Sequence, residues 1–142
     1  MSTHETDFYF WTQEQASLLK QGRYLEVDYE HLIEEIESMG ISERRELTNR
    51  LAVLLAHLLK WKYQPERRGN SWKATVKEQR QKVVRILRQN PSLKKTVGEN
   101  LADAYSDAIQ IAVRETGLEE NTFPTENPWH FEQISNAEFW PN

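Results

Sequence analysis

Histidine and glutamate residues between positions 31 and 57 have the types and spacing that acid–base or metal chemistry would use. His31 lies three residues before Glu34 and four before Glu35, so both pairs can share one face of a helix. Carboxylate di-iron sites in helical bundles are built from inward-facing Glu and His, but they need Glu-x-x-His on two helices, and the sequence contains no such motif. We therefore predict no metal and no cofactor at these residues.

The same stretch favours a polar cluster between helices. Glu35 and Glu37 flank apolar positions, and we expect them to meet Arg44, Arg50 or His57 on the following helix as a buried polar network. General acid–base catalysis by Glu35, Glu37 and His57 stays open as an alternative, because a perturbed carboxylate leaves no trace in a sequence. No catalytic residue is assigned, since the chain has no Gly-x-Ser-x-Gly, phosphate-binding or dinucleotide motif.

A second candidate is the strongly basic segment 60–95. It holds twelve of the eighteen Lys and Arg residues and two of the twenty-two acidic residues, a formal charge of +10, whereas the remaining 106 residues carry −14. A helix with cations along its length can neutralise nucleic-acid phosphates and release their counterions. The cations that would contact nucleic acid or an acidic partner are Arg67, Arg68, Lys73, Lys77, Arg80, Lys82, Arg85 and Arg88.

The protein's own acidic residues offer a competing explanation for this segment. The overall pI of 5.6 is below that of dedicated nucleic-acid binders. Exposed ion pairs contribute only about 0–1 kcal/mol each, yet they help to decide which helices pack together. Acidic residues on neighbouring predicted helices could pair with the basic segment inside one molecule or across a dimer, namely Glu30, Glu34, Glu37, Asp103 and Asp107.

Composition restricts the compartment and the number of domains. A chain of 142 residues is long enough for one domain with a real core. It has no cysteine, as is usual in a reducing cytoplasm. The N-terminus lacks the basic and apolar regions of a signal peptide, and the longest apolar run, LAVLLAHLL, is under half a membrane span. These features predict a soluble cytoplasmic protein with no membrane contact.

The elements that would position these residues are all helices. Capping residues and breakers predict helices from Thr12 to Gly22, from Asp28 to Gly40, from Ser42 to about Tyr63, from Asn70 or Ser71 to Asn90, and from Pro91 to Gly117. Apolar residues recur at three- and four-residue steps and predict buried stripes. The two clearest stripes are Tyr29, Leu32, Ile33, Ile36 and Met39, and then Leu47, Leu51, Leu54, Leu58 and Trp61.

Short loops between amphipathic helices are typical of antiparallel neighbours. We therefore predict the all-α class and a single domain over 1–142, with an antiparallel four- to five-helix bundle over 1–117 and a C-terminal aromatic tail over 118–142 packed across it. Asn127-Pro128 should open one short helix in that tail. We expect Phe123, Trp129 and Phe131 to be buried, whereas Phe139 and Trp140 could be buried or serve as an exposed anchor.

The order of motifs resembles a known bacterial family. The pieces that carry the likeness are Glu34-Glu35-Ile36-Glu37-Ser38, the run from His57 to Pro65, and Pro124 through Phe131. Together with the flanking sequence they make nearly the whole chain similar to the family catalogued as domain of unknown function twenty-nine. That resemblance implies an all-helical cytoplasmic domain in a bacterium, and it implies no catalytic residues.

The leading hypothesis from the sequence is a non-catalytic helical protein that binds another macromolecule, with a protein partner or self-association favoured. It follows from the charge segregation, the aromatic tail and the lack of a catalytic motif. The first alternative is a nucleic-acid-associated factor that uses residues 60–95. The second is an enzyme or metal-binding bundle that uses Glu35, Glu37 and His57.

Overall fold

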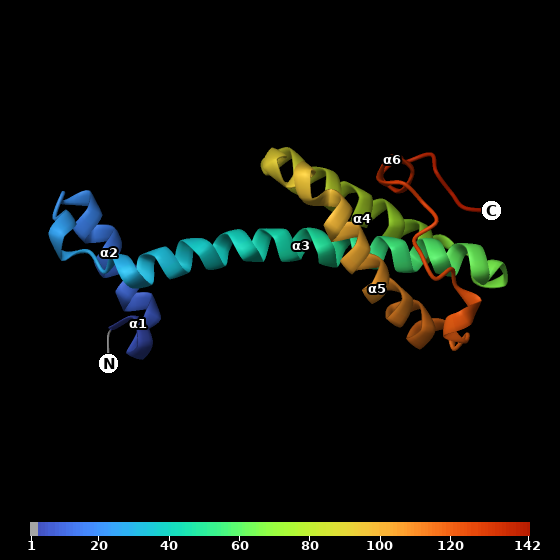
Figure 1. The fold of residues 1–142 in the computed structure, drawn as a ribbon, viewed down its shortest axis with the longest axis horizontal. Helices are drawn as coiled ribbons and strands as arrows, with labels where there is room; N and C mark the ends of the chain where they lie inside the picture. Colours follow the sequence, from blue (N-terminus) through green and yellow to red (C-terminus); the bar gives the residue numbers. More distant parts are fainter. Residues whose placement is uncertain (1–2) are drawn as a thin grey trace. The chain divides into compact units, whose positions relative to one another are not determined.

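A computed structural model describes residues 3–142 of the chain, and all of its regular structure is helical (Figure 1). No strand occurs among these residues, so the predicted all-α class is confirmed. The chain divides into two compact units, an N-terminal unit that ends at Ser42 and a C-terminal unit over Glu43–Asn142. The expectation of a single domain stays a prediction.

The N-terminal unit contains α1 (Thr3–Thr6), α2 (Phe8–Lys20), the 3-10 turn η1 (Tyr24–Glu26) and the first residues of α3 (Tyr29–Tyr63). Helix α2 starts earlier than predicted, because the carboxylate of Asp7 accepts a hydrogen bond from the backbone N–H of Phe10 and caps the helix. Thr12 is therefore not the cap, and its hydroxyl donates to the Tyr9 carbonyl inside the helix. The predicted end is confirmed, since Gly22 has a φ of 73°.

The interior of the N-terminal unit is small and partly polar. Trp11, Gln15 and Val27 are its buried residues. The indole N–H of Trp11 donates to Asp28 Oδ2 at 3.0 Å, and the side-chain oxygen of Gln15 accepts from the Asp28 N–H at 2.7 Å. Asp28 thus joins α2 to the start of α3, where its carboxylate also accepts from the His31 N–H as predicted for a cap.

Helix α3 differs from the prediction at Gly40. The two predicted helices, 28–40 and 42–63, are one continuous helix of 35 residues. Glycine ends a helix well when it adopts a positive φ, and among the described residues only Gly22 and Gly117 do so. Inside a helix a single glycine costs only about 1 kcal/mol relative to alanine, so the helix-forming residues on both sides prevail. The predicted bundle of four or five antiparallel helices is accordingly not confirmed.

The core of the C-terminal unit is built on the predicted seam of α3. Leu47, Leu51, Leu54 and Leu58 are fully buried, and Trp61 is nearly so. The four leucines belong to one apolar cluster with residues of α4 (Asn70–Gln89) and α5 (Val97–Thr116). The contributing residues of these two helices are Val76, Val83, Ile86, Leu87, Ala104, Tyr105, Ala108, Ile109 and Ala112.

Short irregular segments connect these helices. The turn η2 (Pro65–Arg67) leads to Gly69, which takes the N-cap position of α4 in place of the predicted Asn70 or Ser71. Asn90 ends α4 at the predicted residue. Pro91 opens the 3-10 segment η3 (Pro91–Thr96) and α5 begins at Val97, six residues later than predicted. Gly117, with a φ of 74°, ends α5 at the predicted residue.

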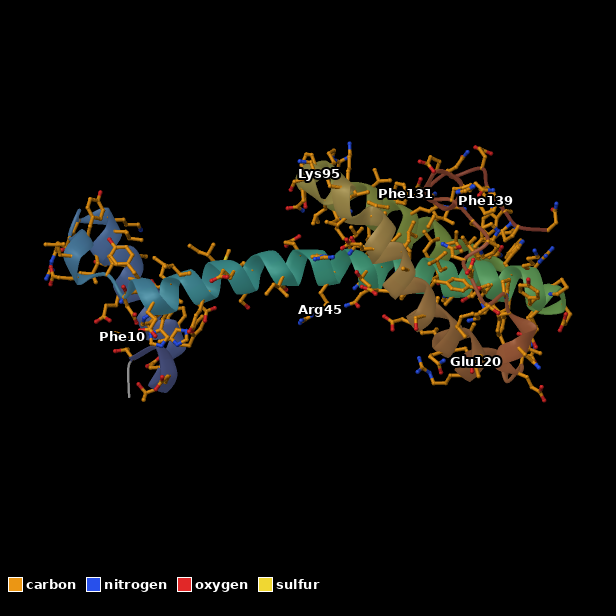
Figure 2. All side chains as sticks on the ribbon, in the orientation of Figure 1. Phe10, Arg45, Lys95, Glu120, Phe131 and Phe139 are labelled. Atoms are coloured by element: carbon orange, nitrogen blue, oxygen red, sulfur yellow. The ribbon has the colours of Figure 1, made fainter. Side chains whose placement is uncertain are left out.

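The chain after Gly117 runs along the helices of the C-terminal unit and contains η4 (Glu120–Thr122) and α6 (Phe131–Ile134) (Figure 1). Phe123, Trp129 and Ile134 are buried in the common apolar cluster, and Phe131, Phe139 and Trp140 pack partly buried against it. Figure 2 labels the side chains of Phe131 and Phe139 in this segment. The hydroxyl of Tyr105 donates to the Pro124 carbonyl at 2.6 Å, and burial raises the pKa of Tyr105 to about 12.

Candidate functional site

The basic segment does not form one uniform exposed surface. Lys73, Lys77, Arg85 and Arg88 are exposed on α4, and Arg67 is exposed in η2. Lys82 pairs with Glu78 one turn away at 3.0 Å. The loop residue Arg68 donates from Nε to the Trp61 carbonyl at 2.6 Å, and its guanidinium lies 5.0 Å from the Trp61 ring centroid.

Arg80 departs most from the prediction, because only 5% of its surface is exposed. It donates from Nε to the Ile134 carbonyl at 2.7 Å, from Nη1 to the Ala137 carbonyl at 3.4 Å, and from Nη2 to the Phe139 carbonyl at 2.5 Å. Burial lowers the pKa of Arg80 from its ordinary value. Its fork of donors therefore holds the C-terminal segment on α4, and little of the side chain is left at the surface.

Two adjoining pockets lie between α4 and the C-terminal segment. One, of about 350 Å³, is lined by Lys73, Lys77 and Trp140, and the other, of about 370 Å³, by Val84, Arg85 and Arg88 among others. Both are bordered by Arg80, Gln81 and Ala137. We call this surface the basic groove, lined by Lys73, Lys77, Arg80, Gln81, Val84, Arg85, Arg88, Ser135, Ala137 and Trp140.

Aromatic and charged side chains pack together beside the basic groove. The rings of Trp61 and Trp140 have centroids 4.4 Å apart, and the Arg80 guanidinium lies 5.4 Å from the Trp140 ring. Buried Lys60 pairs with Glu115 at 2.8 Å and lies 4.9 Å from the Trp72 ring. The hydrogen bond from Lys60 holds the pKa of Glu115 below its usual range.

The residues of the predicted polar cluster have other partners. Glu35 pairs with His4 at 2.7 Å, and Arg50 pairs with Glu46 one turn away on α3. Glu37 is exposed. The expected pairing of Glu35 with Arg44, Arg50 or His57 is therefore wrong, because the Glu35 carboxylate pairs with His4. Sequence spacing did not indicate this partner.

Two of the other predicted members are also engaged elsewhere. His57 Nδ1 lies 2.9 Å from the carbonyl oxygen of Val53, and burial lowers its pKa. Arg44 pairs with Glu99 of α5 at 2.7 Å. Acid–base catalysis by residues of this cluster stays a prediction.

A pair of stacked histidines occupies the N-terminal unit. The rings of His4 and His31 have centroids 4.2 Å apart and are tilted by 18°. His31 Nδ1 lies 2.8 Å from Asp28 Oδ2, and this hydrogen bond raises the pKa of His31. Although partial burial acts to raise the pKa of Asp28, hydrogen bonds from His31 and Trp11 hold it below its usual range.

This histidine pair is not arranged as a metal site. A metal ion binds imidazole in the plane of the ring, and two nearly parallel rings 4.2 Å apart cannot both direct a nitrogen in-plane at one ion. Over residues 3–142, no group of three or more His, Cys, Asp or Glu residues has a spacing suited to a metal. The pair instead joins α1 to α3, because His4 stacks on His31 and pairs with Glu35.

Sequence reasoning missed a large apolar surface in the N-terminal unit. The stripe Tyr29, Ile33, Ile36 and Met39 was expected in the core, yet these side chains are 47%, 55%, 58% and 66% exposed. Periodicity shows that a helix has an apolar face, but it does not show whether the same chain covers that face. No helix in the described part of the chain is long and apolar enough to cross a membrane.

Comparison with known proteins identifies the family and nothing beyond it. Neither the curated proteins nor the solved structures include a match to this chain. The family model described as "Domain of unknown function DUF29" matches residues 3–140 of the 142. That match covers α1 through the C-terminal segment held by Arg80. The chain therefore belongs to the DUF29 family.

Proposed function

We propose that this protein is a non-catalytic helical protein that binds another protein through its N-terminal unit. The observation that carries the proposal is the distribution of exposed large apolar residues. Within residues 3–142 there are twelve of them, and eleven lie between positions 8 and 41: Phe8, Tyr9, Phe10, Leu19, Tyr24, Leu25, Tyr29, Ile33, Ile36, Met39 and Ile41.

Such a concentration supports binding. Soluble monomers rarely expose large contiguous apolar patches, and larger ones mark sites of interaction. These eleven residues expose on the order of 1,000 Å², given that a large aromatic side chain buries about 150–250 Å² when fully covered. One partner in a standard protein–protein interface contributes about 800 Å². The C-terminal unit, by contrast, has only Val84 in the exposed set.

The scaffold and setting of this surface are part of the proposal. The segments between α3 and α4 (64–69) and between α4 and α5 (90–96) are short, which supports an antiparallel bundle in the C-terminal unit, with the aromatic tail packed across it. The lack of cysteine supports a cytoplasmic location, and membership of the family supports a bacterial source. Circular dichroism of residues 43–142 expressed alone would test the bundle, which should stay helical and unfold cooperatively.

Quantitative affinity capture tests the proposed binding. Tagged wild-type chain should retain a protein partner from its native cell extract in a fixed molar ratio, and Ile33→Ser/Ile36→Ser should lose it. Ala102→Ser is the control, because it makes an exposed apolar side chain of α5 polar outside the basic groove. The proposal would be contradicted if wild type, the double variant and the control retained the partner equally. It would also be contradicted if wild type retained no protein in a fixed molar ratio.

A second candidate function is nucleic-acid binding, favoured by the exposed cations of α4. Lys73, Lys77, Arg85 and Arg88 lie along about four turns of one helix and line the basic groove. If these four contact phosphates on a duplex, the logarithm of the binding constant should fall with the logarithm of salt concentration at a slope of about −3.6.

Fluorescence anisotropy with labelled mixed-sequence oligonucleotides would measure that slope. Binding should disappear in Lys77→Glu/Arg85→Glu and persist in Lys94→Glu/Lys95→Glu, which reverses two exposed lysines of η3. Absence of binding at low salt would reject this candidate.

A further inference from the structure

The exposed side of α3 in the N-terminal unit combines apolar and acidic residues. Glu35 and His31 face α1, because Glu35 pairs with His4 and His31 stacks on it. At 100° per residue, Tyr29, Ile33 and Ile36 then lie on the opposite side of the helix. Glu30 and Glu37 lie beside these apolar residues, and Glu34 lies further round the helix. We call this surface the acidic face, made of the exposed residues Tyr29, Glu30, Ile33, Glu34, Ile36 and Glu37.

The basic groove of the C-terminal unit has the complementary chemistry. Its cations Lys73, Lys77, Arg85 and Arg88 surround apolar atoms of Val84 and Trp140. Val84 is the exposed large apolar residue of this unit, at 47%. The groove therefore offers positive charge and apolar contacts along one side of α4.

The acidic face and the basic groove are opposite in charge, and the face is the shorter of the two. Residues 1–42 contain nine acidic and two basic residues, a net charge of −7, whereas residues 43–142 carry +3. The acidic face spans about 12 Å of helix from Tyr29 to Glu37, and the groove follows about 22 Å of α4 from Lys73 to Arg88, at 1.5 Å per residue. The face is thus short enough to lie entirely within the groove.

We propose that the acidic face of one copy docks in the basic groove of a second copy, which rests on the proposed protein-binding function and names its partner. Pairing of two acidic faces with each other would oppose Glu30, Glu34 and Glu37 to their own copies, and like charges across an interface disfavour association. Nucleic acid in the groove would neutralise the cations but leave Tyr29, Ile33 and Ile36 in water. Docking of a second copy covers the apolar residues of one surface and neutralises the cations of the other in one contact.

Sedimentation velocity at about 50 mM salt, with nucleic-acid-free protein, tests the docking directly. The wild-type mass should rise above 16.8 kDa with protein concentration and return toward it at high salt. Glu34→Lys/Glu37→Lys and, separately, Lys77→Glu/Arg85→Glu should each weaken association at least tenfold. Circular dichroism checks that both variants keep their helix content.

Mixing the two variants identifies the contact. The first variant keeps the native groove and the second keeps the native acidic face, so an equimolar mixture should associate although neither variant does so alone. Glu119→Lys/Glu126→Lys and Lys94→Glu/Lys95→Glu change the same charges at exposed sites outside both surfaces and should associate like wild type. A wild-type mass that stays at 16.8 kDa at every concentration, or a mixture that does not associate, overturns the inference.

The outcomes separate this inference from the function on which it rests. If the chain stays monomeric but a different protein is captured in a fixed ratio and lost in Ile33→Ser/Ile36→Ser, the partner is not a second copy and the binding function stands. If self-association is absent and wild type and Ile33→Ser/Ile36→Ser capture the same material, the inference and the binding function both fail. Oligonucleotide that binds wild type while the free protein stays at 16.8 kDa would assign the groove to nucleic acid instead.

Discussion

Arg80 Nη2 donates a hydrogen bond to the carbonyl oxygen of Phe139 at 2.5 Å, across 59 positions of the chain. The same guanidinium also donates to the carbonyls of Ile134 and Ala137. One buried cation on α4 therefore positions three points of the C-terminal segment. Because that segment supplies one wall of the basic groove, Arg80 shapes the groove without being an exposed contact in it.

Removing this guanidinium should destabilise the C-terminal unit. Arg80→Gln cannot reach all three carbonyls, and leaving buried polar groups without partners costs about 1–3 kcal/mol each, so we expect a loss of about 2–3 kcal/mol. Urea denaturation followed by tryptophan fluorescence measures it, with Trp140 reporting release of the segment. The control Arg85→Gln changes an exposed arginine and should stay within about 0.5 kcal/mol. Equal effects of the two substitutions would argue against the Arg80 contacts.

Gly40→Ala should stabilise the chain by about 0.5–1 kcal/mol. Gly40 lies inside continuous α3, its φ is not positive, and no atom lies within 4 Å of an added Cβ, so alanine gains helix propensity without a clash. Gly117→Ala should instead destabilise by about 1–2 kcal/mol, because the left-handed conformation there disfavours a Cβ. Chemical denaturation followed by circular dichroism compares them. A loss of stability in Gly40→Ala would indicate that the helix ends at residue 40.

The pH dependence of stability should contain a contribution from His57. Burial lowers its pKa, so the unfolded chain, with a pKa of about 6.5, takes up this proton more readily than the folded chain. The stabilising contribution is complete above about pH 6.5 and is lost as the pH falls through that value toward the folded pKa.

We expect the unfolding free energy of wild type to fall more between pH 7.5 and pH 5 than that of His57→Gln. Denaturant titrations at a series of pH values measure both chains. Parallel curves for the two chains would show that His57 does not carry this dependence.

The pKa of His31 should be shifted in the opposite direction to that of His57. The hydrogen bond to Asp28 raises its pKa, so His31 stays protonated at a higher pH than a free histidine, whose pKa is about 6.5. NMR titration of the imidazole signals should show this, and Asp28→Asn should bring the pKa of His31 down. The exposed His130, assigned in the same spectra, is the internal control. An unchanged His31 titration in Asp28→Asn would contradict the hydrogen bond.

Local chemistry in the sequence predicted several elements correctly. Gly22 and Gly117 both end helices with positive φ, and the Leu47–Trp61 seam is buried because its apolar residues recur on one helical face. The predicted helix end at Gly40 was wrong because a glycine can end a helix or lie inside one. Which of the two occurs depends on the residues around the glycine.

Tertiary contacts account for what the sequence did not predict. The burial of Arg80 depends on carbonyl groups more than fifty positions away, and backbone acceptors leave no mark in a sequence. Glu35 pairs with His4 at a distance of 31 positions, for which helical periodicity gives no signal. Ile33 and Ile36 look like core residues because an exposed apolar face and a core face have the same spacing.

The most direct test of the central claim, that the exposed apolar residues of α3 contact another protein, is thiol labelling at Ile36→Cys. The chain has no cysteine, so one introduced thiol reports one position, and Ser106→Cys on the exposed side of α5 is the control. We predict that Ile36→Cys reacts with a membrane-permeant maleimide as fast as Ser106→Cys in dilute purified protein, and several-fold more slowly inside the native cells. Equal reactivity of the two thiols inside the cells would contradict the claim.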